Sequence, residues 1–493
     1  MLNRRNVLRG LAAVPGAAAL TGLSAGTARA DFATVVDPTA DWGRWEGWGT
    51  SLSWWAKAVG PDPKLADALF GRGTVQLLGQ TVPGLGMNIV RYNAGASGTN
   101  SINGRTMKPA PSIDGYKQIE GYQLDWFDAD PSSASWNWYA DANQRDMMWL
   151  ARDRGADTFE LFSNSPMWWM LRNDDPRGYD AGWTSNLQDG NYGRHAAYLA
   201  TIARYAHDHW GIDFRSVQPV NEPCLPWTPE MGRGQEGCFF DPAQQARLIK
   251  ETRAQLDARD LAWMEIPAMD ENGYDYALTA WNEFGSDTRQ AVGRINVHGY
   301  RSDTRRDLLY AAAAASGKRI WMSEYTDGDA SGMTIARSIG YDMRWLHPTA
   351  WIHWQIVDNS NGGGWGPVEL VDGRLGLVNT KYYVLAHYMR HIRPGMRIIE
   401  SGHPDVVTAY DRTARKLVIV AANHGGGQYI DFDLSRFTTV ATDGAPVERW
   451  YTSTAGTQRY AYRNDDTFLH GKRFWSWFDT QSVQTFEVGG VDI

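Results

Sequence analysis

The chain has 493 residues, a formal net charge of −8, 24 tryptophans and 22 tyrosines. An acidic protein of this kind is poorly suited to nucleic acid or to an anionic membrane surface, so we expect neither partner. Beyond the N-terminus, no segment has the roughly 18 consecutive apolar residues that a membrane span needs. The many tyrosine and tryptophan rings suit a ligand with flat apolar faces and hydroxyl groups.

The first thirty residues predict an export signal. Arg4 and Arg5 form a twin-arginine pair, a weakly apolar stretch follows from Gly10 to about Ala25, and Ala28-Arg29-Ala30 resembles a cleavage site. We therefore expect a secreted protein that is exported by the twin-arginine route, with residues 1–30 removed. Because this segment carries four arginines and no acidic residue, the mature chain becomes still more acidic.

Short apolar runs alternate with stretches of helical spacing from residue 47 onward. The predicted strands are 47–51, 87–93, 158–163, 216–220, 263–268, 294–298, 319–323 and 350–355. The clearest predicted helices are 143–154, 193–209, 242–259, 304–315 and 334–346. This alternation is typical of parallel βαβ units, and eight units predict a (β/α)8 TIM barrel over residues 47–393. The active site of such a barrel lies at the C-terminal ends of its strands.

A different pattern follows residue 393. The short alternating runs 406–410, 416–421, 429–434, 447–451 and 483–488 predict an antiparallel β-sandwich over residues 394–493. The segment 31–46 precedes the barrel, and we expect it to contribute a strand to this sandwich. The long loop 100–138 after the second strand is rich in aromatic residues, and we expect it to form one wall of a substrate cleft.

Two glutamates follow strands on opposite sides of the predicted barrel. Glu222 comes directly after the fourth strand in Asn221-Glu222-Pro223, and Glu324 ends the seventh in Ser323-Glu324-Tyr325. Two carboxyl groups that face each other across a cleft are what glycoside hydrolysis requires. One protonates the leaving oxygen while the other attacks the anomeric carbon, so their pKa values must differ. We predict Glu222 as the acid/base and Glu324 as the nucleophile of a retaining mechanism.

Neighbouring strand ends supply residues that fit these roles. Arg91, near the end of the second strand, would keep Glu324 ionised and oriented, and Tyr300 would hydrogen-bond the same carboxylate. Asn221 would hold the 2-hydroxyl of a sugar. Further candidates for substrate binding at strand ends are His298, Asn164, Trp168, Trp354 and Trp55.

The chain has two cysteines, Cys224 and Cys238. In an exported protein this spacing predicts a disulfide, which would stiffen the loop after Glu222; the alternative is two unpaired buried thiols. We find no metal-binding motif, P-loop or dinucleotide fingerprint, so we expect neither a metal nor a cofactor.

Several stretches carry a resemblance to a known family. They are 47–56, 85–93, 163–170, 218–223, 323–325 and 381–395. In these stretches the chain resembles glycoside hydrolase family 30, which implies an acid/base at Glu222, a nucleophile at Glu324 and a cleft lined by strand-end aromatics. The opening Gly47–Ala56 is most similar to the endo-β-1,6-galactanases, which implies β-1,6-galactan, such as arabinogalactan side chains, as substrate.

Three other interpretations remain open at this point. The substrate could be another β-linked glycan, with β-1,6-glucan the nearest, or a sugar could replace water as acceptor in a transglycosylase. A non-catalytic carbohydrate-binding protein would lack Glu222, Glu324 or Arg91, and all three are present. We expect a monomer that acts on a β-linked polysaccharide or oligosaccharide.

Overall fold

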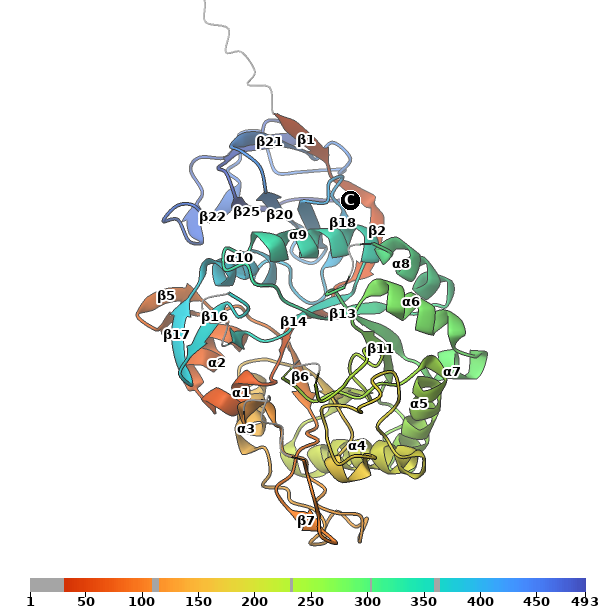
Figure 1. Cartoon of the computed structure of the whole chain (residues 1–493). Coiled ribbons are helices and arrows are strands. Elements are labelled where there is room, and N and C mark those ends of the chain that lie inside the picture. The colour runs from red at the N-terminus through yellow and green to blue at the C-terminus, as the bar shows by residue number, and fades with distance from the viewer. Residues whose placement is uncertain (1–30, 109–114, 231–233, 302–303, 359–363) are drawn as a thin grey trace, which may run out of the picture.

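The structure, a computed structural model, describes residues 31–493 apart from 109–114, 231–233, 302–303 and 359–363. The predicted export signal therefore lies outside the described residues. A parallel barrel surrounded by helices forms one part of the molecule, and two mainly antiparallel sheets pack against one side of it (Figure 1). This confirms the predicted fold class. Within the described residues, no helix is long and apolar enough to cross a membrane.

Eight parallel strands form the barrel. In chain order they are β3 (Gly47–Ser51), β6 (Ile89–Asn93), β9 (Thr158–Phe162), β10 (Phe214–Gln218), β11 (Pro267–Glu271), β12 (Arg294–His298), β13 (Ile320–Tyr325) and β14 (Ala350–His353). The order of neighbours around the sheet is β10-β9-β6-β3-β14-β13-β12-β11. A parallel bridge between Ser216 and Glu265 closes the ring, since Val217 N donates to Glu265 O at 3.0 Å.

Helices cover the outside of the barrel. They are α1 (Trp55–Val59), α2 (Pro63–Phe70), α3 (Ala142–Arg152), α4 (Tyr192–Tyr205), α5 (Pro242–Asp257), α6 (Tyr274–Glu283), α7 (Ser286–Ala291), α8 (Arg306–Ala315), α9 (Met333–Tyr341) and α10 (Thr380–Met389). Helix α5 shows how sequence sets a boundary. The Asp241 side chain accepts from Gln244 N, the Gln244 side chain accepts from Asp241 N, and Pro242 occupies the first turn. This capping box fixes the end of the long loop that follows β10.

Short elements fill the connections. They are the 3-10 turns Gly115–Lys117, Trp168–Met170 and Asp189–Asn191, and the π-helical turns Ala206–Trp210 and Asp342–Leu346. Three small sheets are formed by β4 (Thr74–Leu77) with β5 (Gln80–Pro83), by β7 (Ser101–Ile102) with β8 (Arg105–Thr106), and by β15 (Val357–Asp358), β16 (Val368–Val371) and β17 (Arg374–Val378).

The second part of the molecule contains two sheets. The larger has the order β2 (Asp37–Arg44), β18 (Arg397–Glu400), β19 (Val406–Asp411), β20 (Lys416–Asn423), β25 (Ser482–Val488), β22 (Glu448–Ser453) and β23 (Ala461–Arg463). The smaller has the order β1 (Phe32–Val35), β21 (Gln428–Asp433) and β24 (Arg473–Phe478). The N-terminal strands β1 and β2 thus lie among strands from the end of the chain (Figure 1).

Strand β20 joins the two parts. Leu417 and Ile419 pack in the core between the two sheets, whereas the alternate residues Val418 and Val420 belong to the large core shared with the barrel. Successive side chains of a strand point to opposite faces, so a strand buried on both sides connects two cores. His387 of α10 adds hydrogen bonds of 2.8 Å to two threonine hydroxyls of the larger sheet. The sandwich is therefore anchored rigidly to the barrel.

The fifth barrel strand differs most from its prediction. We predicted it at 263–268, but β11 spans Pro267–Glu271. Residues 261–264 form a turn instead, because Met264 N donates to Leu261 O at 3.0 Å, and Trp263 is 51% exposed. Pro267 begins the strand, a position where proline is tolerated. The shift moves the C-terminal end of the strand to residues that the sequence analysis did not consider.

Candidate active site

Arg91 lies at the centre of the barrel mouth. Its fully buried guanidinium contacts three carboxylates: Nε is 3.0 Å from Glu160 Oε1, Nη2 is 2.5 Å from Asp270 Oδ2, and Nη1 is 2.9 Å from Glu324 Oε2. A planar guanidinium donates in fixed directions, so each contact constrains the others. Arg91 thereby holds Glu324 in one position.

Glu160, on β9, supports Arg91 from the interior of the barrel. Its Oε1 also accepts from Asn296 Nδ2 at 3.0 Å, and its Oε2 accepts from Ser216 Oγ at 2.9 Å and pairs with Arg294. All these side chains are buried. A buried ion pair is tolerable only when its remaining hydrogen-bonding atoms are satisfied, and here they are. The network fixes the orientation of Arg91.

Glu324, the second-last residue of β13, lies beside the phenol of Tyr300 and the side chains of Arg91 and His298. Tyr300 OH donates to Glu324 Oε1 at 3.2 Å, opposite the contact with Arg91. Burial is the strongest influence on its pKa and raises it, while His298 and Arg91 lower it, leaving the pKa at about 7. Glu324 is consequently ionised in a substantial fraction of molecules at neutral pH, and the fraction grows as pH rises.

Glu222 follows β10 on a strained turn. Its φ of 45° lies in the left-handed region, which a residue with a side chain rarely adopts. Glu222 N donates to Asp270 O at 2.9 Å, and Asn272 Nδ2 donates to Glu222 Oε1 at 2.5 Å. Asp270 itself has a φ of 56°. Strain of this kind persists where surrounding contacts over-determine the backbone, and it is common at functional sites.

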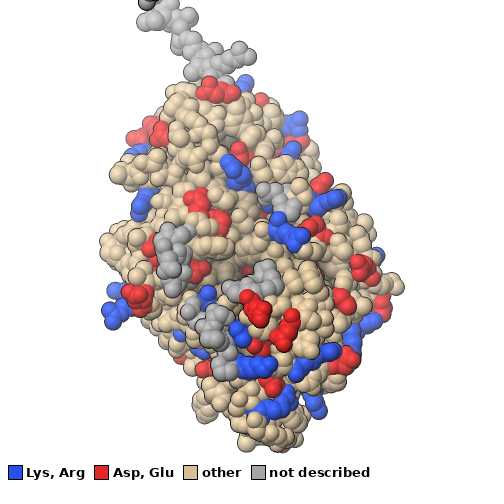
Figure 2. Space-filling view, viewed as in Figure 1, with Lys and Arg blue, Asp and Glu red and all other residues tan. Residues whose placement is uncertain are grey.

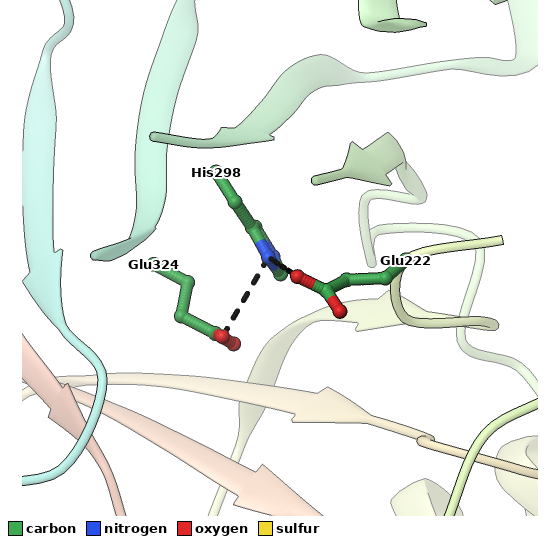
Figure 3. Close-up of side chains that lie close together, drawn as sticks. All are labelled: Glu222, His298 and Glu324. Carbon is green, nitrogen blue, oxygen red and sulfur yellow. Dashed lines mark hydrogen bonds and ion pairs between the residues drawn. The ribbon is translucent and has the colours of Figure 1, made fainter. Parts of the chain in front are cut away.

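His298 lies between the two glutamates (Figure 3). Its Nδ1 is 3.1 Å from Glu222 Oε1 and 3.6 Å from Glu324 Oε1, and its Nε2 is 3.1 Å from Asp270 Oδ1. Burial lowers the pKa of His298, but Glu324 and Asp270 outweigh that effect and raise the pKa to about 10. The carboxylate oxygens near both ring nitrogens therefore favour the imidazolium form of His298.

The same three residues have the spacing of a metal site. Glu222, His298 and Glu324 offer atoms that all lie within 4.8 Å of one another. A metal ligand must be deprotonated, however, and the raised pKa of His298 opposes that. The arrangement fits two-carboxyl chemistry better: one carboxyl can donate a proton to a leaving oxygen while the other attacks from across the cleft.

Buried polar atoms at the mouth lack hydrogen-bond partners among the described residues. They are both amide atoms of Asn93 and Asn164, the amide oxygen of Asn221, the hydroxyl of Ser53, and the indole N–H groups of Trp54 and Trp168. Such atoms are costly unless something binds them. All belong to the C-terminal ends of barrel strands or to the loops that follow them. A ligand with many hydroxyl groups would satisfy them.

The predicted tryptophans divide between cleft and core. Trp354 packs edge-to-face on Trp54 with ring centroids 5.1 Å apart, in a small cluster separate from the main core. Trp168 is fully buried with its N–H unpaired among the described residues. Trp55 does not line the mouth, contrary to our expectation. It begins α1, its ring lies in the main core and its N–H donates to Ser51 O at 2.7 Å.

The predicted disulfide is wrong, because Cys224 and Cys238 are free thiols. Cys224 lies against β11, where its N–H donates to Glu271 Oε2 at 3.0 Å. Cys238 is buried, and its thiol faces the segment around Ser185. The loop after Glu222 thus directs the two side chains toward different neighbours.

Sequence reasoning missed three residues of the site: Asp270, Asn272 and Glu160. Asp270 and Asn272 lie at or just after the end of β11, so the misplaced strand concealed them. Glu160 lies inside β9, below the level at which strand ends were searched. The glutamate inside an otherwise apolar strand was the available signal, because a fully buried charge requires a partner.

Positive and negative residues are interspersed over the face of the molecule shown in Figure 2, and no single basic patch dominates it.

Comparisons with known proteins bear on the family and the fold of the chain. A family model described as O-Glycosyl hydrolase family 30 matches residues 32–292. The chain is 49% identical over 467 residues to an endo-beta-1,6-galactanase from Hypocrea rufa, covering 94% of this chain and 96% of that protein. It is 23% identical to an exo-beta-1,6-galactobiohydrolase from Bifidobacterium longum, covering 92% of this chain and 39% of that protein. A family 30 subfamily 8 xylanase from Clostridium acetobutylicum shares the fold, with a TM-score of 0.67, 22% identity, and coverage of 93% of this chain and 99% of that one.

Proposed function

Because the chain belongs to O-glycosyl hydrolase family 30 and is a glycoside hydrolase, we propose that it cleaves β-1,6-linked galactan, such as the side chains of arabinogalactan. One observation carries the choice of substrate: the identity of 49% to an endo-beta-1,6-galactanase extends over nearly the full length of both chains. The aligned residues include the loops that shape the cleft as well as the strands and helices of the barrel.

The proposed mechanism is a double displacement with retention. Glu324 attacks the anomeric carbon while Glu222 protonates the leaving oxygen; a water activated by Glu222 then releases the glycosyl group from Glu324. Oxygens of the two carboxyl groups lie within 4.8 Å of each other. This supports retention, because retaining enzymes place the carboxyl groups roughly 5–5.5 Å apart and inverting enzymes separate them further.

The surrounding charges support both roles. Arg91 and the His298 imidazolium lower the pKa of Glu324 against the effect of burial and so favour the ionised nucleophile. After Glu222 gives up its proton, its new negative charge faces His298 Nδ1 at 3.1 Å and the amide of Asn272. Donors that are already in place stabilise a charge that develops during the reaction.

Substrate binding would use the mouth residues. The Trp54–Trp354 pair offers an aromatic surface for the apolar face of a sugar, and Asn164, Asn221 and Trp168 offer unpaired polar groups for its hydroxyls.

Product analysis tests the proposal. The mature protein is incubated with de-arabinosylated β-1,6-galactan and, separately, with β-1,6-glucan, and products are identified by mass, linkage and early proton NMR. Galactobiose and longer β-1,6-galacto-oligosaccharides whose new reducing ends are first β would support it. Untouched galactan with cleaved glucan would overturn the substrate, and a first-formed α anomer would overturn retention.

We also propose export by the twin-arginine route and a monomeric mature chain. Replacing Arg4 and Arg5 together with lysine should leave the protein inside the producing cell, and secretion of the variant at the parental level would refute the route. Light scattering during size-exclusion chromatography tests the monomer.

A further inference from the structure

A cavity of about 620 Å³, here called the side cavity, opens on the outer wall of the barrel, and Trp136, Trp138, Tyr139, Tyr205 and His209 are among its lining residues. Tyr205 ends α4, and His209 lies in the π-helical turn that follows it. None of its described lining residues contacts Glu222, His298 or Glu324. The side cavity is therefore separate from the candidate active site.

Parallel aromatic rings form one wall of the side cavity. The rings of Trp136 and Trp138 are 5.2 Å apart at an interplanar angle of 8°, and those of Trp138 and Tyr205 are 3.6 Å apart at 4°. The Trp138 N–H donates to Pro131 O at 2.7 Å, which fixes its orientation. The stacked rings cover one another's faces and form a rigid wall, and Tyr139 on the rim is the lining ring that stays open to solvent.

Two observations indicate a ligand with both apolar faces and hydroxyl groups. Tyr139, on the rim, is 90% exposed, so a large ring remains in solvent beside an aromatic cavity. The buried indole N–H of Trp136 has no hydrogen-bond partner among the described residues, although such groups normally find one. The polar side chains of Asn137 and His209 lie in the same lining.

The charges of the lining favour a neutral ligand. Its residues include no aspartate or glutamate. The guanidinium of Arg145, the cation in the lining, donates to Trp138 O and Ala140 O and lies over the rings of Trp149 and Trp210. Its charge is engaged by the protein itself, so an anion would gain little there.

We propose that the side cavity is a second binding site for the neutral glycan, which holds a polymer chain at a distance from the catalytic glutamates. The identity of that glycan rests on the proposed function. A second contact makes rebinding intramolecular, so it raises the apparent affinity for polymer without a new contact at the active site. Short oligosaccharides that fill only the catalytic cleft gain nothing from it.

Polymer binding to non-cleaving protein tests this inference. The full mature chain carrying Glu324→Gln is compared with the same protein carrying Tyr139→Ala or Asn137→Ala, by affinity electrophoresis in soluble de-arabinosylated β-1,6-galactan. The control is Phe127→Ala, which removes a ring of the same loop that is 64% exposed and lies outside the lining. We expect roughly three- to tenfold weaker binding of polymer for the Tyr139 variant and no change for the control.

Kinetics separate the possible outcomes. In the active enzyme, Tyr139→Ala should raise KM for polymer relative to KM for galactotriose. Parental binding and an unchanged ratio would overturn the side cavity as a glycan site while leaving the proposed function intact. A parent that neither binds nor cuts galactan would refute the proposed function and, with it, this ligand. A change in oligomeric state without a change in galactan binding would show that the cavity instead contacts a second copy of the chain.

Discussion

Replacing His298 with glutamine tests the electrostatic account of Glu324, the proposed nucleophile. His298 places a positive charge 3.6 Å from Glu324 Oε1, and it is the strongest of the influences that lower the pKa of Glu324. Glutamine retains a hydrogen-bond donor of similar size but removes the charge. The pKa of Glu324, about 7 in the parent, should therefore rise in the variant.

The size of the effect follows from the distance. Unit charges 3.6 Å apart attract by about 4–5 kcal/mol at an effective dielectric constant of about 20. If screening and repacking leave one third of this, about 1.5 kcal/mol remains, which is roughly a tenfold change in the ionised fraction below pH 7. Activity at pH 6 should then fall about tenfold from this cause alone, and part of the loss should be recovered at alkaline pH.

The assay is the pH dependence of kcat/KM on a soluble oligosaccharide. The acidic limb reports ionisation of the nucleophile in free enzyme, and it should move to higher pH in His298→Gln. Tyr300→Phe is the matched control, because it removes a neutral hydrogen bond of 3.2 Å to the same carboxylate and no charge. An acidic limb that stays in place, or moves to lower pH, would refute the reasoning, provided that thermal unfolding shows the variant to be folded.

Three further predictions concern the nucleophile, the thiols and a buried acid. Glu324→Gln should lower kcat by at least about 1,000-fold with little change in melting temperature, and more than one percent residual activity would remove Glu324 as nucleophile. The double variant Cys224→Ser, Cys238→Ser should melt at the same temperature with and without reductant, as should the parent, because both thiols are free; a parent that reductant destabilises would contradict this. Burial raises the pKa of Glu236 to about 8, so its contribution to stability is complete below pH 4.5 and is lost as pH rises through 8. Glu236→Gln should therefore gain on the order of a few kcal/mol over the parent between pH 5 and pH 9, while the exposed Glu283→Gln should show no such trend, as followed by thermal melts.

Periodicity alone located most of the barrel, and the physical reason is the parallel sheet. All eight strands end at the same rim, so a residue that follows one predicted strand must lie near residues that follow the others. This rule brought together Arg91, Glu222, His298, Tyr300 and Glu324 from four separate strands, and the structure places them in one cluster. No long-range contact had to be known beforehand.

This rule fails where the predicted end of a strand is wrong by a few residues. It also fails where either of two adjacent side chains could enter the core. The apolar residues around Trp263 favoured a strand that ended before Asp270, although the chain there turns and exposes its tryptophan. Trp54 and Trp55 are adjacent, and only the start of α1 at Trp55 decides which ring enters the core. The spacing of Cys224 and Cys238 also allowed a disulfide, but both thiols are free. The hydrophobic periodicity of the sequence does not predict the path of the irregular loop between them.

Arg91 lies at the boundary between paired and unpaired polar side chains within the barrel. Glu160 is its Cα partner in the sheet, and Glu160, Arg294 and Asn296 leave no side-chain atom of theirs unsatisfied among the described residues. Closer to the C-terminal ends of the strands, the amides of Asn93 and Asn164 remain unpaired. The barrel pairs every polar atom of Glu160, Arg294 and Asn296, so the unpaired amides of Asn93 and Asn164 do not reflect poor packing in general. We propose that these amides are held ready for the hydroxyl groups of a substrate, at a cost in stability while the site is empty.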